Sequence, residues 1–142
     1  MLFRSGMSDD EYRTHLTLWS MLSAPLLLGN DIRSMTPETR ALLGNKDVIA
    51  IDQDALGAEG RRITQSGAIE VWTKALADGA VAMAIFNRGD SPADAEVHWE
   101  ELGVFDPTAV YDLWRHVEEP AMAKAYLASV RPHGVLFLRL RP

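Results

Sequence analysis

Two carboxylates, Asp52 and Asp54, lie two residues apart at the end of a short apolar run in the segment KDVIAIDQDALG, residues 46–57. Paired carboxyl groups can hydrolyse glycosidic bonds, and they then lie roughly 5–5.5 Å apart for retention and about 6.5–9.5 Å apart for inversion. On an extended segment these two would point the same way, about 6.6 Å apart. Neighbours on one short segment present parallel carboxylates and cannot approach a sugar ring from different sides. We therefore predict that the pair makes turn and junction hydrogen bonds.

The histidines and tryptophans are the other side chains that could hold a metal or a sugar. The four histidines are His15, His98, His116 and His133. They show no metal-ligand spacing such as H-x-x-x-H, so the sequence indicates no metal site. We expect His15 to pack within an apolar helical stripe and His133 to occupy a turn. Trp72, Trp99 and Trp114 could stack on sugar rings, but their alternating positions favour a place in the core.

The composition excludes several classes of function. The chain has 142 residues, a net charge of −6 and no cysteine. Nucleic-acid binding needs clustered Lys and Arg, so we expect no nucleic-acid partner. The absence of cysteine excludes disulfides and thiol catalysis. The longest uncharged run, residues 16–30, includes a proline and a glycine and is too short to span a bilayer, so we expect no membrane partner.

The beginning of the chain lacks the cleavable apolar region of a signal peptide. We interpret residues 2–5, LFRS, as foreign to the natural protein, because a common sequencing adapter encodes these residues when it is translated.

Residues 7–57 show helical periodicity with one interruption. Residues 8–11 have the S-x-x-E form of a capping box, and apolar residues then recur at helical spacing until Pro25. Residues 26–28, all leucine, are apolar on both faces, which predicts a buried parallel strand. Thr36 and Pro37 open a second helix. A single parallel strand has no neighbours within this chain, so this part is a fragment of an α/β layer.

Residues 58–142 change to a period of two. Apolar residues alternate with polar or small ones in six runs, and clusters of Gly, Pro and Asp separate the runs. The runs lie at or around residues 63, 69–71, 81–85, 95–99, 110–114 and 135–137. This pattern predicts a Greek-key antiparallel β-sandwich of seven or eight strands, and hence a mainly β fold class.

Two groups of motifs resemble one known family. Residues 11–57 contain, in order, E-Y-x-T-H, W-x-x-x-x-A-P-L, N-D and I-x-Q-D-x-L-G. This order is similar to the end of the catalytic barrel in glycoside hydrolase family 27, the α-galactosidases. The later VWTKAL, VAMAIFNRG and VRPHGVLFLRL resemble the C-terminal β-sandwich of the same family. The resemblance extends over nearly all of residues 6–141.

The resemblance implies that residues 1–57 are the helix–strand–helix remnant of a (β/α)8 barrel and that residues 58–142 form the sandwich domain. It places the last barrel strand at about residues 24–30, between helices at 8–23 and 36–43. Family members cleave terminal α-galactosyl groups with retention, using two aspartates in motifs resembling K-Y-D and R-x-x-x-D. Neither motif occurs in this chain. We therefore expect a C-terminal fragment of a retaining α-galactosidase that has no catalytic residues of its own and is inactive alone.

Asn30 and Asp31 are weak candidates for substrate binding, because barrel enzymes place their chemistry at the C-terminal ends of strands. The resemblance gives these two positions no catalytic role, and Asp31 would alternatively bond the loop that follows it. No cofactor is implied, since hydrolysis by two carboxyl groups needs only water.

Two other functions stay open. One is the same family acting on N-acetylgalactosamine, arabinopyranose or isomalto-oligosaccharides, because the pocket loops that discriminate these sugars lie upstream. The other is a non-catalytic sandwich that binds carbohydrate or buttresses a barrel.

For the parent enzyme we expect α-galactosides as partners. Its location is open, because any signal peptide would lie upstream; secretion or a periplasmic location would be typical of the family. We also expect the fragment to self-associate, because a missing barrel would leave the apolar surface of residues 12–28 uncovered.

Overall fold

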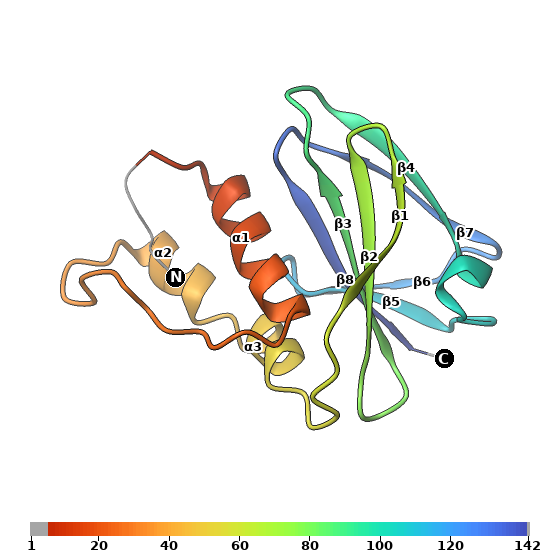
Figure 1. Ribbon diagram of the computed structural model, residues 1–142, viewed down its shortest axis with the longest axis horizontal. Helices are drawn as coiled ribbons and strands as arrows, with labels where there is room; N and C mark the ends of the chain where they lie inside the picture. The colour runs from red at the N-terminus through yellow and green to blue at the C-terminus, as the bar shows by residue number, and fades with distance from the viewer. Residues whose placement is uncertain (1–5, 142) are drawn as a thin grey trace.

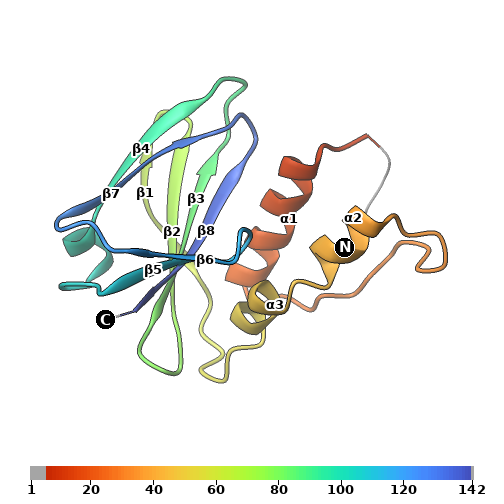
Figure 2. The ribbon, with the colours of Figure 1, turned by 180° about the vertical axis from the view of Figure 1, so that it is seen from behind.

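Three layers follow one another in the computed structural model, which describes residues 6–141 (Figure 1). Helices form the first layer, a six-stranded sheet the second and a two-stranded sheet the third. The view from behind shows the same order (Figure 2). The expectation that residues 2–5 are foreign concerns residues outside the described range.

The six-stranded sheet has the order β1-β2-β3-β8-β5-β6, and all its pairs are antiparallel. Its strands are β1 (Arg61–Ser66), β2 (Ile69–Ala75), β3 (Val81–Asn87), β8 (Val135–Arg141), β5 (Ala109–Asp112) and β6 (Val117–Pro120). The second sheet pairs β4 (Ala93–His98) with β7 (Ala125–Val130), and the short 3-10 helix η1 (Trp99–Leu102) follows β4. The chain passes to the second sheet between β3 and β8 and does so twice. The prediction of a mainly β, antiparallel sandwich is confirmed.

The two predicted helices begin where the sequence predicts, and a third, which was not predicted, follows them. Helix α1 (Asp9–Met21) starts with the predicted capping box: the Glu11 backbone N–H donates to Ser8 Oγ at 3.3 Å, and the Ser8 N–H donates to the Glu11 carboxylate at 2.6 Å. Helix α2 (Pro37–Leu43) has Thr36 as its N-cap and proline at its first position. A third helix, α3 (Lys46–Asp52), follows at once and leads into the sandwich.

Strand β3 divides the apolar core in two. Ala82 and Ala84 face the helices, where the cluster includes Leu16 of α1. Met83 and Ile85 face the two-stranded sheet and belong to a second cluster. The small alanine side chains leave room for α1 to lie directly on the sheet. The helices and the larger sheet therefore share the first of these two clusters.

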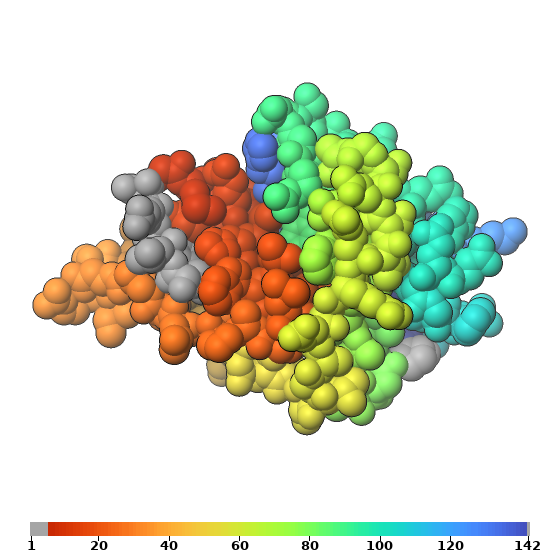
Figure 3. All heavy atoms as spheres, in the orientation of Figure 1, coloured from red at the N-terminus to blue at the C-terminus, as the bar shows by residue number. Residues whose placement is uncertain are grey.

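The segment expected to be the last barrel strand, residues 24–30, forms no strand. Leu27 is 73% exposed and Leu28 is 46% exposed, so the prediction of a buried strand is wrong for this chain. The reason is the lack of neighbours: among the described residues no strand runs beside this segment to accept and donate its backbone hydrogen bonds. The loop that follows projects from the side of the molecule opposite the two-stranded sheet (Figure 3).

Candidate functional site

The carboxylate pair lies at the junction between the helices and the sandwich. Asp52 is the last residue of α3, not part of an extended segment, and is only 4% exposed. Its Oδ2 accepts from the Gln53 side chain, while Oδ1 has no partner among the described residues. Asp54 lies in the loop beyond, where its Oδ1 accepts the backbone N–H groups of Leu56 at 3.0 Å and Ala77 at 2.9 Å. The turn and junction hydrogen bonds predicted for this pair are therefore present on Asp54.

A buried lysine joins the layers beside Asp52. Lys74, in β2, is only 1% exposed. Its Nζ donates to Ser23 Oγ at 2.7 Å, to the Ser20 carbonyl at 3.0 Å and to the Ile51 carbonyl at 2.6 Å. Burial lowers the pKa of Lys74 from its usual value, and the Asp52 charge opposes this. Burial likewise raises the pKa of Asp52, against the effects of the Gln53 hydrogen bond and the Lys74 charge.

One ammonium group of the sheet therefore binds the C-terminal ends of both α1 and α3. Carbonyls at helix C-termini favour a positive charge, so the ammonium of Lys74 lies where both helix ends favour it. The sequence analysis did not predict this contact. The signal for it was a lysine at a strand position that faces the interior.

The two candidates for substrate binding, Asn30 and Asp31, lie in the loop between α1 and α2. Asp31 accepts three hydrogen bonds from Arg33: from the backbone N–H and from Nε, each at 3.0 Å, and from Nη2 at 3.1 Å. The Arg33 side chain lowers the pKa of Asp31. These hydrogen bonds agree with the alternative prediction that Asp31 bonds the loop that follows it. Asn30 is half-buried, and its Oδ1 lacks a partner among the described residues. Substrate binding by either residue stays a prediction.

The tryptophans pack within the protein, as their positions favoured. Trp99 begins η1 and donates to the Met122 carbonyl at 2.6 Å. Trp114 lies in the turn after β5, not on a strand, and donates to Thr17 of α1 at 3.0 Å. Trp72 of β2 meets a Phe86 ring edge-on.

The histidines behave similarly. His15 is half-buried beside the Trp19 ring, and burial lowers its pKa. His133 occupies a turn with φ 54°, as expected. In residues 6–141 no group of three or more His, Asp or Glu side chains is arranged to hold a metal ion. None of the helices in this range has the length and apolar character needed to cross a membrane.

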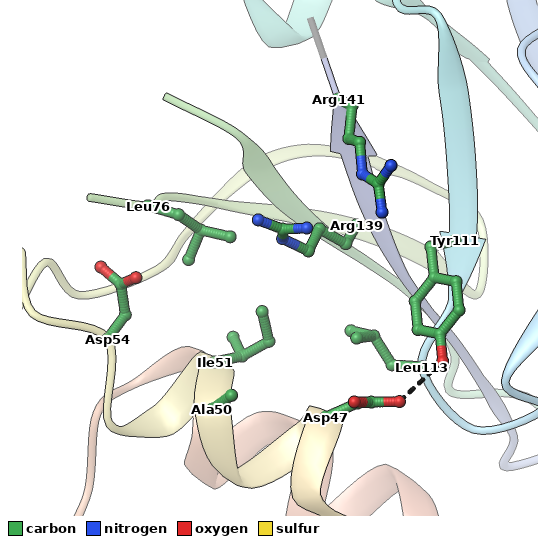
Figure 4. Close-up of a pocket in the computed structure, with 9 residues that line it drawn as sticks. All are labelled: Asp47, Ala50, Ile51, Asp54, Leu76, Tyr111, Leu113, Arg139 and Arg141. Atoms are coloured by element: carbon green, nitrogen blue, oxygen red, sulfur yellow. Dashed lines mark hydrogen bonds between the residues drawn. The ribbon is translucent and has the colours of Figure 1, made fainter. Parts of the chain in front are cut away.

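A groove of about 420 Å³ lies between α3 and the larger sheet (Figure 4). At one end Asp47 Oδ2 accepts from the Tyr111 hydroxyl at 2.8 Å and contacts His116 Nδ1 at 2.7 Å. The hydrogen bond to Asp47 raises the pKa of Tyr111. Partial burial alone would raise the pKa of Asp47, but the bonds from Tyr111 and His116 outweigh it and lower that pKa. The lining residues are Asp47, Ala50, Ile51, Asp54, Leu76, Tyr111, Leu113, Arg139 and Arg141. Sequence reasoning did not find this groove, whose residues come from distant parts of the chain.

Comparison with known proteins identifies the sandwich. Residues 66–140, more than half of the chain, match the family model described as the alpha galactosidase C-terminal beta sandwich domain. The chain belongs to the α-galactosidase family. Residues 1–54 match a second model of this family, described as alpha galactosidase A.

The relatives that this chain matches are much longer than the chain itself. Alpha-galactosidase 2 of Arabidopsis thaliana is 40% identical over 131 residues, which are 91% of this chain and 33% of that protein. The crystal structure of α-galactosidase I from Mortierella vinacea has a TM-score of 0.91 at 30% identity and covers 98% of this chain and 38% of its own. A family 27 β-L-arabinopyranosidase from Geobacillus stearothermophilus has a TM-score of 0.91 at 26% identity over 99% of this chain and 32% of its own. The chain therefore spans about a third of the curated relatives it matches, their C-terminal part.

Proposed function

We propose that this chain is the C-terminal part of a retaining α-galactosidase, which hydrolyses terminal α-galactosyl groups. The observation that carries the proposal is the order of the two family matches, 1–54 and then 66–140, in a chain that spans about a third of its relatives. In the complete enzyme, segment 24–30 would become the last barrel strand once neighbouring strands supply hydrogen-bond partners. The division into a barrel remnant, residues 1–57, and a sandwich domain, residues 58–142, belongs to the same proposal.

The chain alone would then have no hydrolytic activity, because the family's two aspartate motifs are absent from it. Loss of catalytic carboxylates costs orders of magnitude in rate. We expect no turnover of a nitrophenyl α-galactoside by the purified chain. Turnover that Asp52→Asn or Asp54→Asn abolishes would contradict the proposal and the structural role of this pair.

A chimera tests the positive side of the proposal. The upstream two thirds of the Arabidopsis relative, joined to this chain at its first matched residue, should hydrolyse the nitrophenyl α-galactoside. The same chimera with the barrel aspartates of the relative changed to asparagine is the control. A folded chimera without activity would show that this chain cannot complete the enzyme.

A second candidate is the same fold acting on another sugar. The match to a β-L-arabinopyranosidase at 26% identity favours this alternative specifically. The complete natural protein, assayed with nitrophenyl α-galactoside and β-L-arabinopyranoside in parallel, separates the two, since only one substrate should be turned over efficiently.

We further propose that the chain alone self-associates through the face that a barrel would cover. Leu22, Leu27, Leu28 and Ile32 are exposed in the segment that runs from the end of α1 toward α2. Burying a large apolar side chain is worth about 1.5–3 kcal/mol, so leaving several exposed favours association. Light scattering should give a mass that rises with concentration, and Leu27→Gln with Leu28→Gln should reduce it. A monomer at all concentrations would contradict the proposal.

A further inference from the structure

The groove between α3 and the larger sheet has walls of opposite charge (Figure 4). Asp47 and Asp54 lie on the side of α3, and Arg139 and Arg141 lie on β8. Between them the floor is aliphatic, with Ile51 and Leu113 among its side chains. Two negative and two positive groups cancel, so the groove has no net charge from its lining. This balance disfavours a strongly charged ligand and favours one that both donates and accepts hydrogen bonds.

The carboxylates are held in place by donors and keep capacity for more. Both the Tyr111 hydroxyl and His116 Nδ1 contact Oδ2 of Asp47, at 2.8 and 2.7 Å, which leaves Oδ1 outside these bonds. Two backbone N–H groups donate to Oδ1 of Asp54, at 3.0 and 2.9 Å, and leave its Oδ2 outside them. The Tyr111 hydroxyl donates its hydrogen bond to Asp47 and keeps its proton, and its oxygen retains lone pairs that can accept.

The arginines are fixed in the same way. Arg139 pairs with Asp78, and Arg141 Nη2 lies 3.1 Å from Glu118 Oε2. Each guanidinium carries five N–H donors, so these pairs fix its position and leave donors for the groove. Each of the four charged groups of the lining therefore has a partner within the chain, which lowers the entropy cost of orienting it for a ligand.

We propose that this groove binds a neutral hexopyranose, as a single ring or as the end unit of an oligosaccharide. Neighbouring sugar hydroxyls can donate to the carboxylates and accept from the guanidiniums at the same time, and the C–H face of the ring covers the aliphatic floor. The volume of about 420 Å³ falls within the range of about 300–1,000 Å³ usual for small-molecule sites. This inference does not depend on the catalytic role of the parent enzyme, because its test uses the chain alone.

The test is an NMR titration of the isotope-labelled chain with galactose, glucose and raffinose. We expect saturable shifts of the backbone amides of Ala50, Tyr111 and Arg139, with a Kd in the millimolar range, about what a shallow site of this size gives. No shift up to the solubility limit, or shifts mapped away from the groove, would overturn the proposal. Sulfate or glucuronate bound in the groove more tightly than the neutral sugars would overturn it as well.

Two variants localise the binding. Arg139→Met removes a donor and should weaken binding about tenfold, the effect of losing a charged hydrogen bond. Ala50→Leu keeps every polar group but fills the groove from α3, and it should also abolish the shifts. Arg88→Met, at an exposed position outside the groove, is the matched control and should bind as the unchanged chain does. Unaltered binding by the Ala50→Leu protein, shown to be folded by its spectrum, refutes the assignment even if Arg139→Met does not fold.

Discussion

Replacing Lys74 by methionine perturbs the contact that joins the helices to the larger sheet. The ammonium is buried and donates to three acceptors at the ends of α1 and α3, the shortest being the Ile51 carbonyl at 2.6 Å. Methionine has a similar length and no branch, so it can fill the same space. The substitution therefore removes the hydrogen bonds and the charge with little change in packing.

The expected magnitude follows from these contacts. The Ile51 carbonyl loses its donor, at a cost of about 1–3 kcal/mol. Losing the hydrogen bond to the Ser20 carbonyl costs less, because the Ser23 N–H still donates to that carbonyl at 3.3 Å. The buried Asp52 loses a nearby positive charge, and this loss is offset by the ammonium no longer being desolvated. We expect the free energy of unfolding to fall by about 2–3 kcal/mol.

Urea unfolding followed by tryptophan fluorescence measures this change. Lys124→Met, the same chemical change at an exposed position, is the control and should stay within about 0.5 kcal/mol of the unchanged chain. A Lys74→Met protein as stable as the control would show that the free energy gained from the hydrogen bonds only offsets the cost of burying the ammonium charge. The conclusion that Lys74 stabilises the joined layers would then be refuted.

Three further predictions use the same junction and core. Burial raises the pKa of Asp52 above its usual 3.8, so the stability gained from its proton is present below that value and is lost as the pH rises through the folded pKa. The unchanged chain should therefore lose stability relative to Asp52→Asn as the pH rises above 3.8 in urea unfolding, and a constant difference would contradict this. Gly60→Ala would place its Cβ 2.8 Å from the Met21 carbonyl oxygen, whose hydrogen bond from the Gly60 N–H is 2.6 Å long. We expect about 1–3 kcal/mol of destabilisation in thermal unfolding, and an unchanged Tm would show that the junction yields freely. Hydrogen exchange should protect amides 81–86 much more than amides 26–28, because only the former lie in a sheet; equal protection of the two segments would contradict this.

Local patterns were sufficient to predict the elements that depend on neighbours in sequence. The capping box at Ser8 and Glu11 begins α1, because both partners lie within one helical turn. The alternation along β3 separates Ala84 from Met83 on opposite faces, as a period of two requires. These features need no information from distant residues.

The failures share a different cause, since they depend on what lies beside a segment in space. The three leucines 26–28 have strand character, but strand pairing needs neighbouring strands, and residues 6–141 place none beside them. Lys74 alternates correctly, yet nothing in its own segment indicates that it meets the ends of two helices. The groove likewise joins Asp47, Tyr111 and Arg139, which are far apart in sequence.

The packing of helix α1 explains why the helical layer stays in place on the sandwich. Its apolar stripe is wider than one interface needs, and the structure divides it: Leu16 and Met21 are buried, while Leu22 is 38% exposed. The first two side chains pack in the core shared with the sandwich, and Leu22 is exposed to solvent, as are Leu27 and Leu28. The side of α1 that carries Leu16 and Met21 packs on the sandwich whether or not a second copy is present. Association between copies should therefore use the exposed apolar side chains and leave α1 folded. Hydrogen exchange on α1 amides should therefore be the same in dilute and concentrated samples, while Leu27 becomes more protected on concentration.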